Sequence, residues 1–472
     1  MAQYKSRLSL PCPAPCKHLS TFRAVSLLGT LLATGSTLTG CSSVKSADHH
    51  LFGHTQPVNS PIGGTVVADE PQAALVGRDI LARGGNAADA ATATAFALSV
   101  TLPSRASLGG GGACLAVRPH APAQAIVFLP VDGSGTGNRP ASVPMMPRGF
   151  FLLQSLYGSV QFGDTLDPAI ALSQQGTTVS QALASDLHVV GSSLLSDPAA
   201  RTVFGKSDDT PLNVGDQLVQ SRLSSFLSRL KLVGVGDLYN GALAQVFTDQ
   251  ANQAGGGLNK NDLRRSIPYT SKTLTLSSGP YQLSFLPPPA DGGIGSAAAY
   301  SRGVSAQNAV SAWRRSMMST VPQAQSFIMS GKTDPSGLPP LPASTSFVVS
   351  DQHGMAVGCV LSENNLFGTG RIAGATGVVL GAASRHYPRP LLTSALVQDQ
   401  RGRLRAVLAA SGQNDAAETV AQALRHITNG NTPVPNHGSG RLNSITCDGD
   451  PSSCKGNTDP RGNGMSAYIS PR

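Results

Sequence analysis

The sequence predicts an α+β globular fold, in which helices pack against strands that pair through tight turns. Apolar residues recur at helical spacing from Ala73 to Leu81, and a nearly continuous Ala-rich run follows from about Ala87 to Val100. The stretch STSFVVSDQHGMAVGCVL, residues 344–361, is instead typical of two β-strands joined by the turn DQHG. Helical and hairpin patterns in one chain favour the α+β class.

The composition is that of a folded globular chain and indicates no nucleic-acid partner. The 472 residues include 52 glycines, 13% of the residues are charged, and the formal net charge is +9. Four of the positive charges lie in the first 40 residues, and no Lys/Arg run is interleaved with aromatic residues. We therefore expect no binding to nucleic acid.

The first 41 residues have the pattern of a bacterial lipoprotein signal. Basic residues end at Arg23, and the apolar run AVSLLGTLLATGSTLTG, too short and too rich in Gly and Thr for a membrane span, stops at Cys41. The ending LTGC resembles a lipobox, whose cysteine becomes lipidated. We expect residues 1–41 to be the signal, residues 42–60 a tether, and the protein to be anchored to the periplasmic face of the outer membrane through Cys41. The alternative is an ordinary signal peptide that contains a cysteine.

The remaining cysteines fall into two kinds. Cys447 and Cys454 flank the polar loop DGDPSS, and an oxidising periplasm lets them pair. Cys114 and Cys359 lie in apolar strands, and we expect them to be buried thiols. No His or Cys stands at metal-ligand spacing to them, so we predict no metal site, and the residues imply no cofactor.

Four glycines in LGGGG, residues 108–112, lead from the Ala-rich run into a strand. Glycine allows close approach of the backbone, so we expect tight packing against the Ala-rich helix. A phosphate-binding loop is excluded because no Lys-Ser/Thr pair follows the glycines.

Eight segments, taken in order, resemble the γ-glutamyltranspeptidase family. They are GGNAADA, LGGGG, VPMMPRGFFLLQSLYG, LDPAIALSQQGTTVSQALASDL, LPPPADGG, STSFVVSDQHGMAV, LFGTGRIAGATGVVL and DPRGNGMSAY, which lie between about Pro61 and Tyr468. The resemblance implies the fold of the N-terminal-nucleophile hydrolases, a four-layer αββα sandwich. It also implies a chain that cuts itself before a Thr, whose freed α-amino group then serves as the base for its own hydroxyl.

The resemblance divides the chain into a large-subunit half, residues 61–343, and a small-subunit half, residues 344–472. Residues 303–343 are rich in Ser, Gln and Pro and end in SGKTDPSGLPPLPA, so we expect them to form a flexible linker that moves away after the cut. Aligned without gaps, Ser344 takes the nucleophile position, Thr345 the second Thr position and Ser346 the place of a His. Ser can perform the same N→O acyl shift. Thr345 as nucleophile requires a one-residue slip that breaks the register of the following strand.

Other family positions are partly kept. Ser362 falls where a family Thr lies near the nucleophile, and Asn364, three residues before Phe367, matches an Asn that contacts substrate. The segment ASGQN resembles the Gly-Gly oxyanion loop, with Gly412 kept and Gln413 in place of the second glycine. The backbone N–H survives that change, so we expect the oxyanion hole to survive if the local backbone does not require a positive φ.

The residues that hold the glutamyl head group in the family are replaced here. Leu129 stands in place of the carboxylate-binding Arg, His386 in place of the amino-binding Asp and Ala383 in place of a Gln. Leu392 and Thr393 replace paired serines. Leucine cannot replace a bidentate Arg–carboxylate contact, so we expect ordinary γ-glutamyl specificity to be weakened.

Three functions are compatible with this pattern. The chain is a self-processing amidase or acyltransferase with altered acyl specificity, acting on a small acyl amide with water or an amine as acceptor. Alternatively, it is a γ-glutamyl enzyme in which Arg105 or Arg385 holds the glutamate. In the third case, it is an inactive lipoprotein that uses the sandwich as a binding or structural module. Arg385 and His386, with Arg371 and Arg389 close in sequence, favour acyl chains that end in a carboxylate without an amine, of the glutaryl type.

Overall fold

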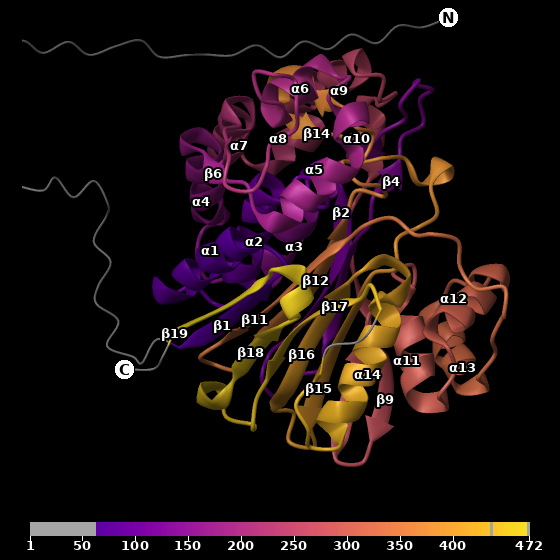
Figure 1. Cartoon of the computed structure of the whole chain (residues 1–472). Coiled ribbons are helices and arrows are strands. Elements are labelled where there is room, and N and C mark those ends of the chain that lie inside the picture. The colour runs from indigo at the N-terminus through magenta and orange to yellow at the C-terminus, as the bar shows by residue number, and fades with distance from the viewer. Residues whose placement is uncertain (1–62, 435–437, 470–472) are drawn as a thin grey trace, which may run out of the picture. The chain divides into compact units, whose positions relative to one another are not determined.

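The computed structural model describes residues 63–434 and 438–469, which form two antiparallel β-sheets covered by helices (Figure 1). The fold is the predicted four-layer arrangement, with helices outside both sheets. The predicted signal at 1–41, its Cys41 and the tether at 42–60 lie outside the described residues.

The first sheet has seven strands, and the predicted hairpin lies in its interior. Phe347 faces Ala68 across one ladder and Cys359 across the other, so strand β11 is paired on both sides. In spatial order the strands are β19 (Met465–Ile469), β1 (Gly64–Ala68), β11 (Thr345–Asp351), β12 (Ala356–Ser362), β2 (Gly111–Val117), β3 (Gln124–Phe128) and β8 (Tyr269–Lys272).

The second sheet has six strands and packs face to face on the first. Val348 and Val360 of the first sheet and Leu396 and Val407 of the second belong to one buried cluster between them. Alternate residues of each strand supply this cluster, as the two-residue period of a strand requires. The strands, in spatial order, are β18 (Lys455–Thr458), β17 (Arg441–Thr446), β16 (Leu404–Ser411), β15 (Thr393–Asp399), β10 (Tyr281–Phe285) and β9 (Leu274–Ser278).

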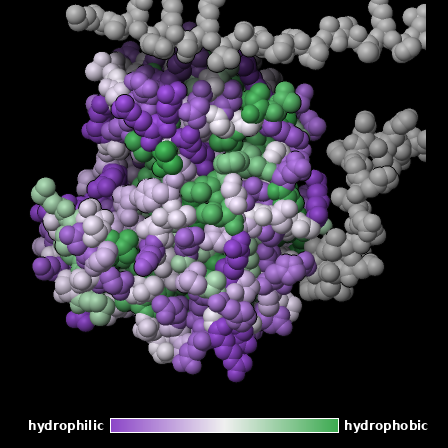
Figure 2. Space-filling model, turned by 180° about the vertical axis from the view of Figure 1, so that it is seen from behind, coloured by the Kyte–Doolittle hydropathy of each residue, from purple (hydrophilic) through white to green (hydrophobic). Residues whose placement is uncertain are grey.

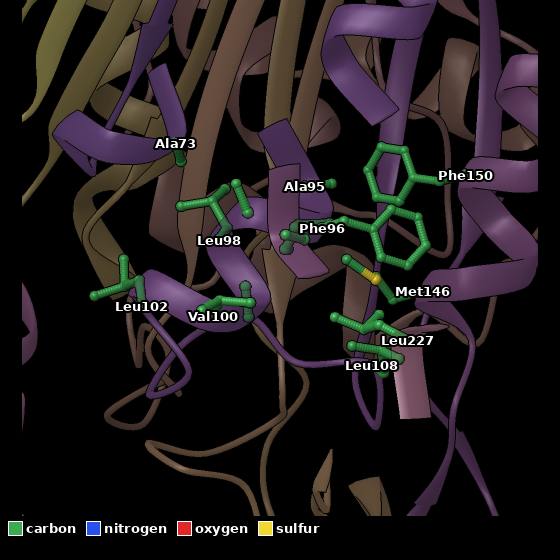
Figure 3. Close-up of a cluster of buried hydrophobic side chains, with 14 of the residues drawn as sticks. Ala73, Ala95, Phe96, Leu98, Val100, Leu102, Leu108, Met146, Phe150 and Leu227 are labelled. Carbon is green, nitrogen blue, oxygen red and sulfur yellow. The ribbon is translucent and has the colours of Figure 1, made fainter. Parts of the chain in front are cut away.

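Helices α1 (Pro71–Ala82), α2 (Ala87–Thr101) and α3 (Met146–Tyr157) cover the seven-stranded sheet. The first two confirm the predicted helices, and every residue of α2 is buried, as its apolar sequence predicts. Phe150 of α3 lies 5.2 Å, ring to ring, from Phe128 of β3 and 6.3 Å from Phe347 of β11. Figure 3 shows part of this cluster, including Phe96, Met146 and Phe150.

Helices α11 (Gly292–Arg302) and α14 (Ala416–Thr428) cover the six-stranded sheet. A further group of helices gathers beyond α2 and α3 at one end of the molecule (Figure 1). These are α4 (Phe162–Gln175), α5 (Gln181–Leu194), α6 (Pro198–Phe204), α7 (Ser221–Val233), α8 (Val235–Asn240), α9 (Ala242–Gln253) and α10 (Lys260–Arg265). Short two-stranded pieces, β4–β5, β6–β7 and β13–β14, complete the architecture.

The segment 303–343, which we expect to form a flexible linker, is partly helical. It contains helix α12 (Ala306–Arg315) and helix α13 (Val321–Ser330). Trp313 of α12 and Phe327 of α13 pack edge to face with 5.4 Å between ring centroids, inside the cluster beneath the six-stranded sheet. These helices were not predicted because their few buried aromatic residues stand among many polar ones. Residues 332–343 have neither helix nor strand.

The glycine run is tightly packed, but against strands and a loop rather than against α2. A Cβ added to Gly111 would lie 2.2 Å from the carbonyl oxygen of Phe128, and one on Gly112 would lie 2.3 Å from that of Val360. A Cβ on Gly109 would lie 2.4 Å from the carbonyl oxygen of Val379. These positions exclude any side chain because neighbouring backbone fills the space.

The expectation of free thiols at Cys114 and Cys359 is also wrong. The two residues lie directly opposite each other in the β2–β12 ladder and form a disulfide, with 4.1 Å between their Cα atoms. A separation of 245 residues gave no sequence signal for this pair. A second disulfide joins Cys447 and Cys454 around the DGDPSS loop.

Within residues 63–434 and 438–469, no helix is both long enough and apolar enough to cross a membrane. The face drawn in Figure 2 carries separate hydrophobic patches among hydrophilic residues.

Candidate active site

Ser344 lies immediately before β11, where the chain enters the sandwich. Its side chain is 2% exposed, and its hydroxyl oxygen has no hydrogen-bond partner among the described residues. A buried hydroxyl normally has a partner, because leaving one unpaired costs about 1–3 kcal/mol. Ser344 therefore carries a free hydroxyl group at the position predicted for the nucleophile.

The carbonyl group that precedes Ser344 is held in place. The Ser362 hydroxyl donates a 2.8 Å hydrogen bond to the carbonyl oxygen of Ala343. The backbone N–H of Asn364 donates to the Ser362 oxygen at 3.1 Å, and the Asn364 amide donates to the carbonyl oxygen of Ala382 at 2.9 Å. Asn364 has a φ of 58°, a left-handed conformation that Asn tolerates better than most residues. The structure thus brings together Ser344, Ser362 and Asn364.

Thr345 is occupied by a different network. Its hydroxyl donates to the Asp69 carboxylate at 3.1 Å, and the backbone N–H of Ser346 donates to the same oxygen at 2.9 Å. The other Asp69 oxygen accepts a 2.7 Å hydrogen bond from the Asn443 amide, which also donates to the carbonyl oxygen of Ser346. These hydrogen bonds hold the first residues of β11 against β17 and against the residue that follows β1.

Asp69 and Asn443 were not predicted as site residues. They lie 374 residues apart and meet only because β1 and β17 both lie beside β11. An acidic residue that follows an apolar strand gives no sequence signal of this contact, although Asp69 is only 5% exposed in the structure.

The loop that resembles the oxyanion hole does require positive φ. Gly412 has a φ of 105°, and Gln413 has a φ of 55°, so the replacement residue adopts a left-handed conformation. The Gln413 amide donates a 2.9 Å hydrogen bond to the carbonyl oxygen of Leu341. The condition under which we expected the oxyanion hole to survive is therefore not met, and the Gln413 side chain contacts the segment before Ser344.

The positions that hold a glutamyl head group in the family are apolar or occupied. Leu392 is buried in the cluster between the sheets, and Leu129 packs against that cluster. The Thr393 hydroxyl is buried and pairs with that of Ser296 of α11 at 2.7 Å. Thr393 is thus directed toward the helix layer.

Arg105 is committed to an ion pair. Its guanidinium group donates to both carboxylate oxygens of Asp186 at 2.7 Å. Burial opposes the charge on Arg105, but the hydrogen bonds and charge of Asp186 outweigh this effect and raise its pKa above the ordinary value. Arg371 is likewise paired, with Asp197 at 2.8 Å. Neither arrangement leaves a free guanidinium group for a substrate carboxylate.

Arg385 and His386 line a cavity of about 590 Å³, together with Arg139, Thr369 and Tyr387. The Arg385 guanidinium donates to the carbonyl oxygens of Gly133 and Gly135 at 3.0 and 3.2 Å. This basic cavity borders the chain segment that begins at Ala382, whose carbonyl oxygen accepts from Asn364.

Glu363, between Ser362 and Asn364, was not predicted as a site residue. It is fully buried, and neither carboxylate oxygen has a hydrogen-bond partner among the described residues. Burial raises its pKa well above the ordinary value, so the neutral acid is favoured. An acidic residue at the end of a strand gives no sequence signal of such burial.

Across the described ranges, no three His, Cys, Asp or Glu side chains gather in a way that could hold a metal ion. The chemistry available at Ser344 is that of a hydroxyl group, a polarised carbonyl and backbone amides.

Comparisons with known proteins agree with this geometry. The family profile described as Gamma-glutamyltranspeptidase matches residues 73–301. The chain is 34% identical over 254 residues to the glutathione hydrolase proenzyme of Escherichia coli (strain K12), covering 49% of this chain and 43% of that protein. It is 27% identical over 256 residues to the acylase ACY 1 proenzyme of Pseudomonas sp. (strain SE83), covering 49% of this chain and 46% of that protein.

A solved structure shows the same fold. The cephalosporin acylase from Bacillus halodurans matches 90% of this chain and 99% of its own chain, with a TM-score of 0.68 and 17% sequence identity. The curated relatives are matched over less than half of their own length. The profile match and the ordered motifs show that residues 73–301 match the γ-glutamyltranspeptidase family, and the paired sheets of the chain agree with that similarity.

Proposed function

We propose that the protein is a self-processing amidohydrolase or acyltransferase whose nucleophile is Ser344. The observation that carries this proposal is the pair formed by the unpartnered Ser344 hydroxyl and the Ala343 carbonyl oxygen held by Ser362. Both curated relatives described above are named as proenzymes, which supports processing of this chain. The Asp69 hydrogen bond to Thr345 supports Ser344 over Thr345 as the attacking residue.

The first reaction is the cut between Ala343 and Ser344. The Ser344 oxygen attacks the Ala343 carbonyl carbon, and the Ser362 hydroxyl stabilises the charge that develops on the carbonyl oxygen. The carbon–nitrogen bond breaks, the hydroxyl proton passes to the leaving nitrogen, and an ester forms. Water then hydrolyses the ester, leaving a carboxylate on Ala343 and a free α-amino group on Ser344.

The second reaction uses the freed residue. The α-amino group of Ser344 takes the proton from its own hydroxyl, which attacks the carbonyl of an acyl amide and releases the amine. The acyl ester then passes to water or to an amine acceptor. This sequence requires no metal or cofactor because the hydroxyl and amine belong to one residue.

The acyl group is proposed to differ from an ordinary γ-glutamyl group. Leu129 and Leu392 offer no charge to an α-carboxylate, and Arg105 is already paired with Asp186. The basic cavity at Arg385 and His386 favours a glutaryl-type acyl chain over the γ-glutamyl chain of a glutathione-type substrate, because an α-ammonium would meet like charge there. The name acylase in one relative supports acyl groups other than γ-glutamyl.

The mass of the purified protein tests this function. We expect the small fragment to begin with the sequence STSFVV, Ser344→Ala to remain a single chain, and Ser344→Thr to cut at least as well as the wild type. A fragment that begins with TSFVVS would assign the nucleophile to Thr345. A wild-type chain that stays intact after prolonged incubation would reject the enzyme and leave the inactive binding module.

We also propose that the protein is anchored to the outer membrane through Cys41, facing the periplasm. The lipobox-like sequence supports the anchor. The disulfides Cys114–Cys359 and Cys447–Cys454 support an oxidising compartment.

A further inference from the structure

The turn after β16 forms hydrogen bonds with the segment that precedes the proposed cut. The Gln413 amide donates to the carbonyl oxygen of Leu341 at 2.9 Å, and the Leu341 N–H donates to the Asn414 side-chain oxygen at 3.0 Å. The Asn414 amide also donates to the carbonyl oxygen of Pro339 at 3.0 Å. Two adjacent amide side chains therefore bind both main-chain polar groups of Leu341.

The same segment is fixed by two further contacts. The Leu341 side chain is 2% exposed and packs in an apolar cluster with residues of α11, α12 and α14, among them Ala299, Val310 and Ala417. Two residues later, Ser362 holds the carbonyl oxygen of Ala343. Pro342, between these anchors, has a restricted φ. The path from Leu341 to the proposed scissile bond is thus held at both ends.

The backbone conformation of Gln413 is one that glycine adopts more readily, which indicates that the side chain of Gln413 has a functional role. A φ of 55° is strained for a residue with a Cβ, whereas glycine adopts it freely. Such strain persists where surrounding contacts stabilise it, often at functional sites. The contact that the structure shows for this side chain is the hydrogen bond to Leu341.

We infer that Gln413 and Asn414 are positioning residues for self-cleavage, which present the Ala343 carbonyl to Ser344 by binding the backbone of Leu341. The inference rests on the proposed cut between Ala343 and Ser344. Intramolecular attack is fast only when the reacting atoms are held close and aligned, so the rate depends on groups that restrict this short segment.

Four variants of the full chain test the inference, with the cleavage rate and the thermal unfolding midpoint measured on each. Gln413→Gly removes the amide donor and relaxes the backbone, so we expect cleavage to slow about 5- to 10-fold, the equivalent of one net hydrogen bond, without a lower unfolding midpoint. Gln413→Glu keeps the length of the side chain but cannot donate when ionised, and it should be slowed as well.

Asn414 provides the matched pair. Asn414→Asp keeps an oxygen that accepts from the Leu341 N–H, so its rate should stay closer to wild type than that of Asn414→Ala. A purely structural role predicts that rate and unfolding midpoint fall together. Wild-type rates in Gln413→Gly and Asn414→Ala overturn the inference and leave the proposed function intact. A wild-type chain that never cuts overturns the proposed function and, with it, this inference.

Discussion

The Ser362 hydroxyl donates a 2.8 Å hydrogen bond to the carbonyl oxygen of Ala343, the group that precedes the unpartnered hydroxyl of Ser344. This contact places a donor on the oxygen where negative charge would develop during self-cleavage. It joins the end of β12 to the residue that immediately precedes the proposed cut.

Removal of this donor should slow self-cleavage. For Ser362→Ala we expect the rate to fall about 10²- to 10³-fold, the usual effect of deleting one oxyanion-hole donor. Ser362→Thr keeps the hydroxyl and is the matched control. The rate is measured as the loss of full-length chain on denaturing gels. Equal rates in wild type and Ser362→Ala would contradict the role of this contact.

The Cys114–Cys359 disulfide should keep the two fragments covalently linked after the cut, because one cysteine lies in each half. We expect a single band on denaturing gels without reductant and two bands with reductant. A Cys114→Ser/Cys359→Ser variant should give two bands in both cases. The matched control is Cys447→Ser/Cys454→Ser, whose disulfide lies within the small half and should not alter the pattern. Fragments of the wild type that separate without reductant would be incompatible with this pairing.

The acyl preference can be measured on matched p-nitroanilides. We expect a higher kcat/KM for the glutaryl than for the γ-glutamyl substrate, because the guanidinium groups of Arg139 and Arg385 repel an α-ammonium group. His386→Asp should shift the ratio toward γ-glutamyl by about tenfold, or ~1.4 kcal/mol. Arg371→Lys, at a residue that does not line the cavity and is paired with Asp197, should leave the ratio unchanged. A wild-type preference for γ-glutamyl of about tenfold would show that glutamate is held in another way.

Glu363 should make the protein less stable as the pH rises. Its ordinary pKa is 4.5, and burial raises the folded-state value well above this. Below about pH 4.5 both folded and unfolded states are protonated. Above it, the unfolded state releases the proton first, so the free energy of unfolding falls until the folded-state pKa is reached.

Glu363→Leu should remove this pH dependence and raise the free energy of unfolding at neutral pH by about 1–3 kcal/mol, the cost of an unpaired buried polar group. Glu70→Ala is the contrasting variant, because the Glu70 carboxylate caps α1 through the Ala73 N–H at 2.8 Å. Its loss should lower stability by about 0.5–2 kcal/mol. Chemical denaturation between pH 4 and pH 8 measures both. A destabilised Glu363→Leu protein would indicate a partner for this carboxyl group.

The anchor is tested by fractionation of cells. Cys41→Ser should move the protein from the membrane fraction to the soluble periplasm, since acyl chains provide the attachment. Cys12→Ser alters a cysteine within the signal and should leave the protein in the membrane fraction. Retention of Cys41→Ser in membranes would refute the lipid anchor.

Local patterns predicted the parts of the fold that depend on neighbours in sequence. The helices at Pro71–Ala82 and Ala87–Thr101 and the hairpin of β11 and β12 follow from apolar spacing and turn residues. The helices within 303–343 were missed because their apolar anchors, such as Trp313 and Phe327, are few among polar residues.

Contiguous family motifs supplied the candidate site residues Ser344, Ser362 and Asn364, which the structure places close together. Contacts made by tertiary pairing escaped prediction, because the partners are far apart in the chain. Asp69 reaches Asn443 only because the two sheets pack face to face, and Cys114 meets Cys359 only through ladder register. The hydrogen bond from Gln413 to Leu341 was not predicted for the same reason.

Strand β11 lies inside the seven-stranded sheet, between β1 of the large half and β12 of the small half. A cut before Ser344 therefore leaves each half with strands that complete the other's sheet. The mature molecule would have lost the direct link from α13 into β11 along which the uncut chain folds. The stability of the cut molecule would then be kinetic: it would be set by the rate of unfolding rather than by a reversible folding equilibrium. Only chains that had folded before the cut would reach this state.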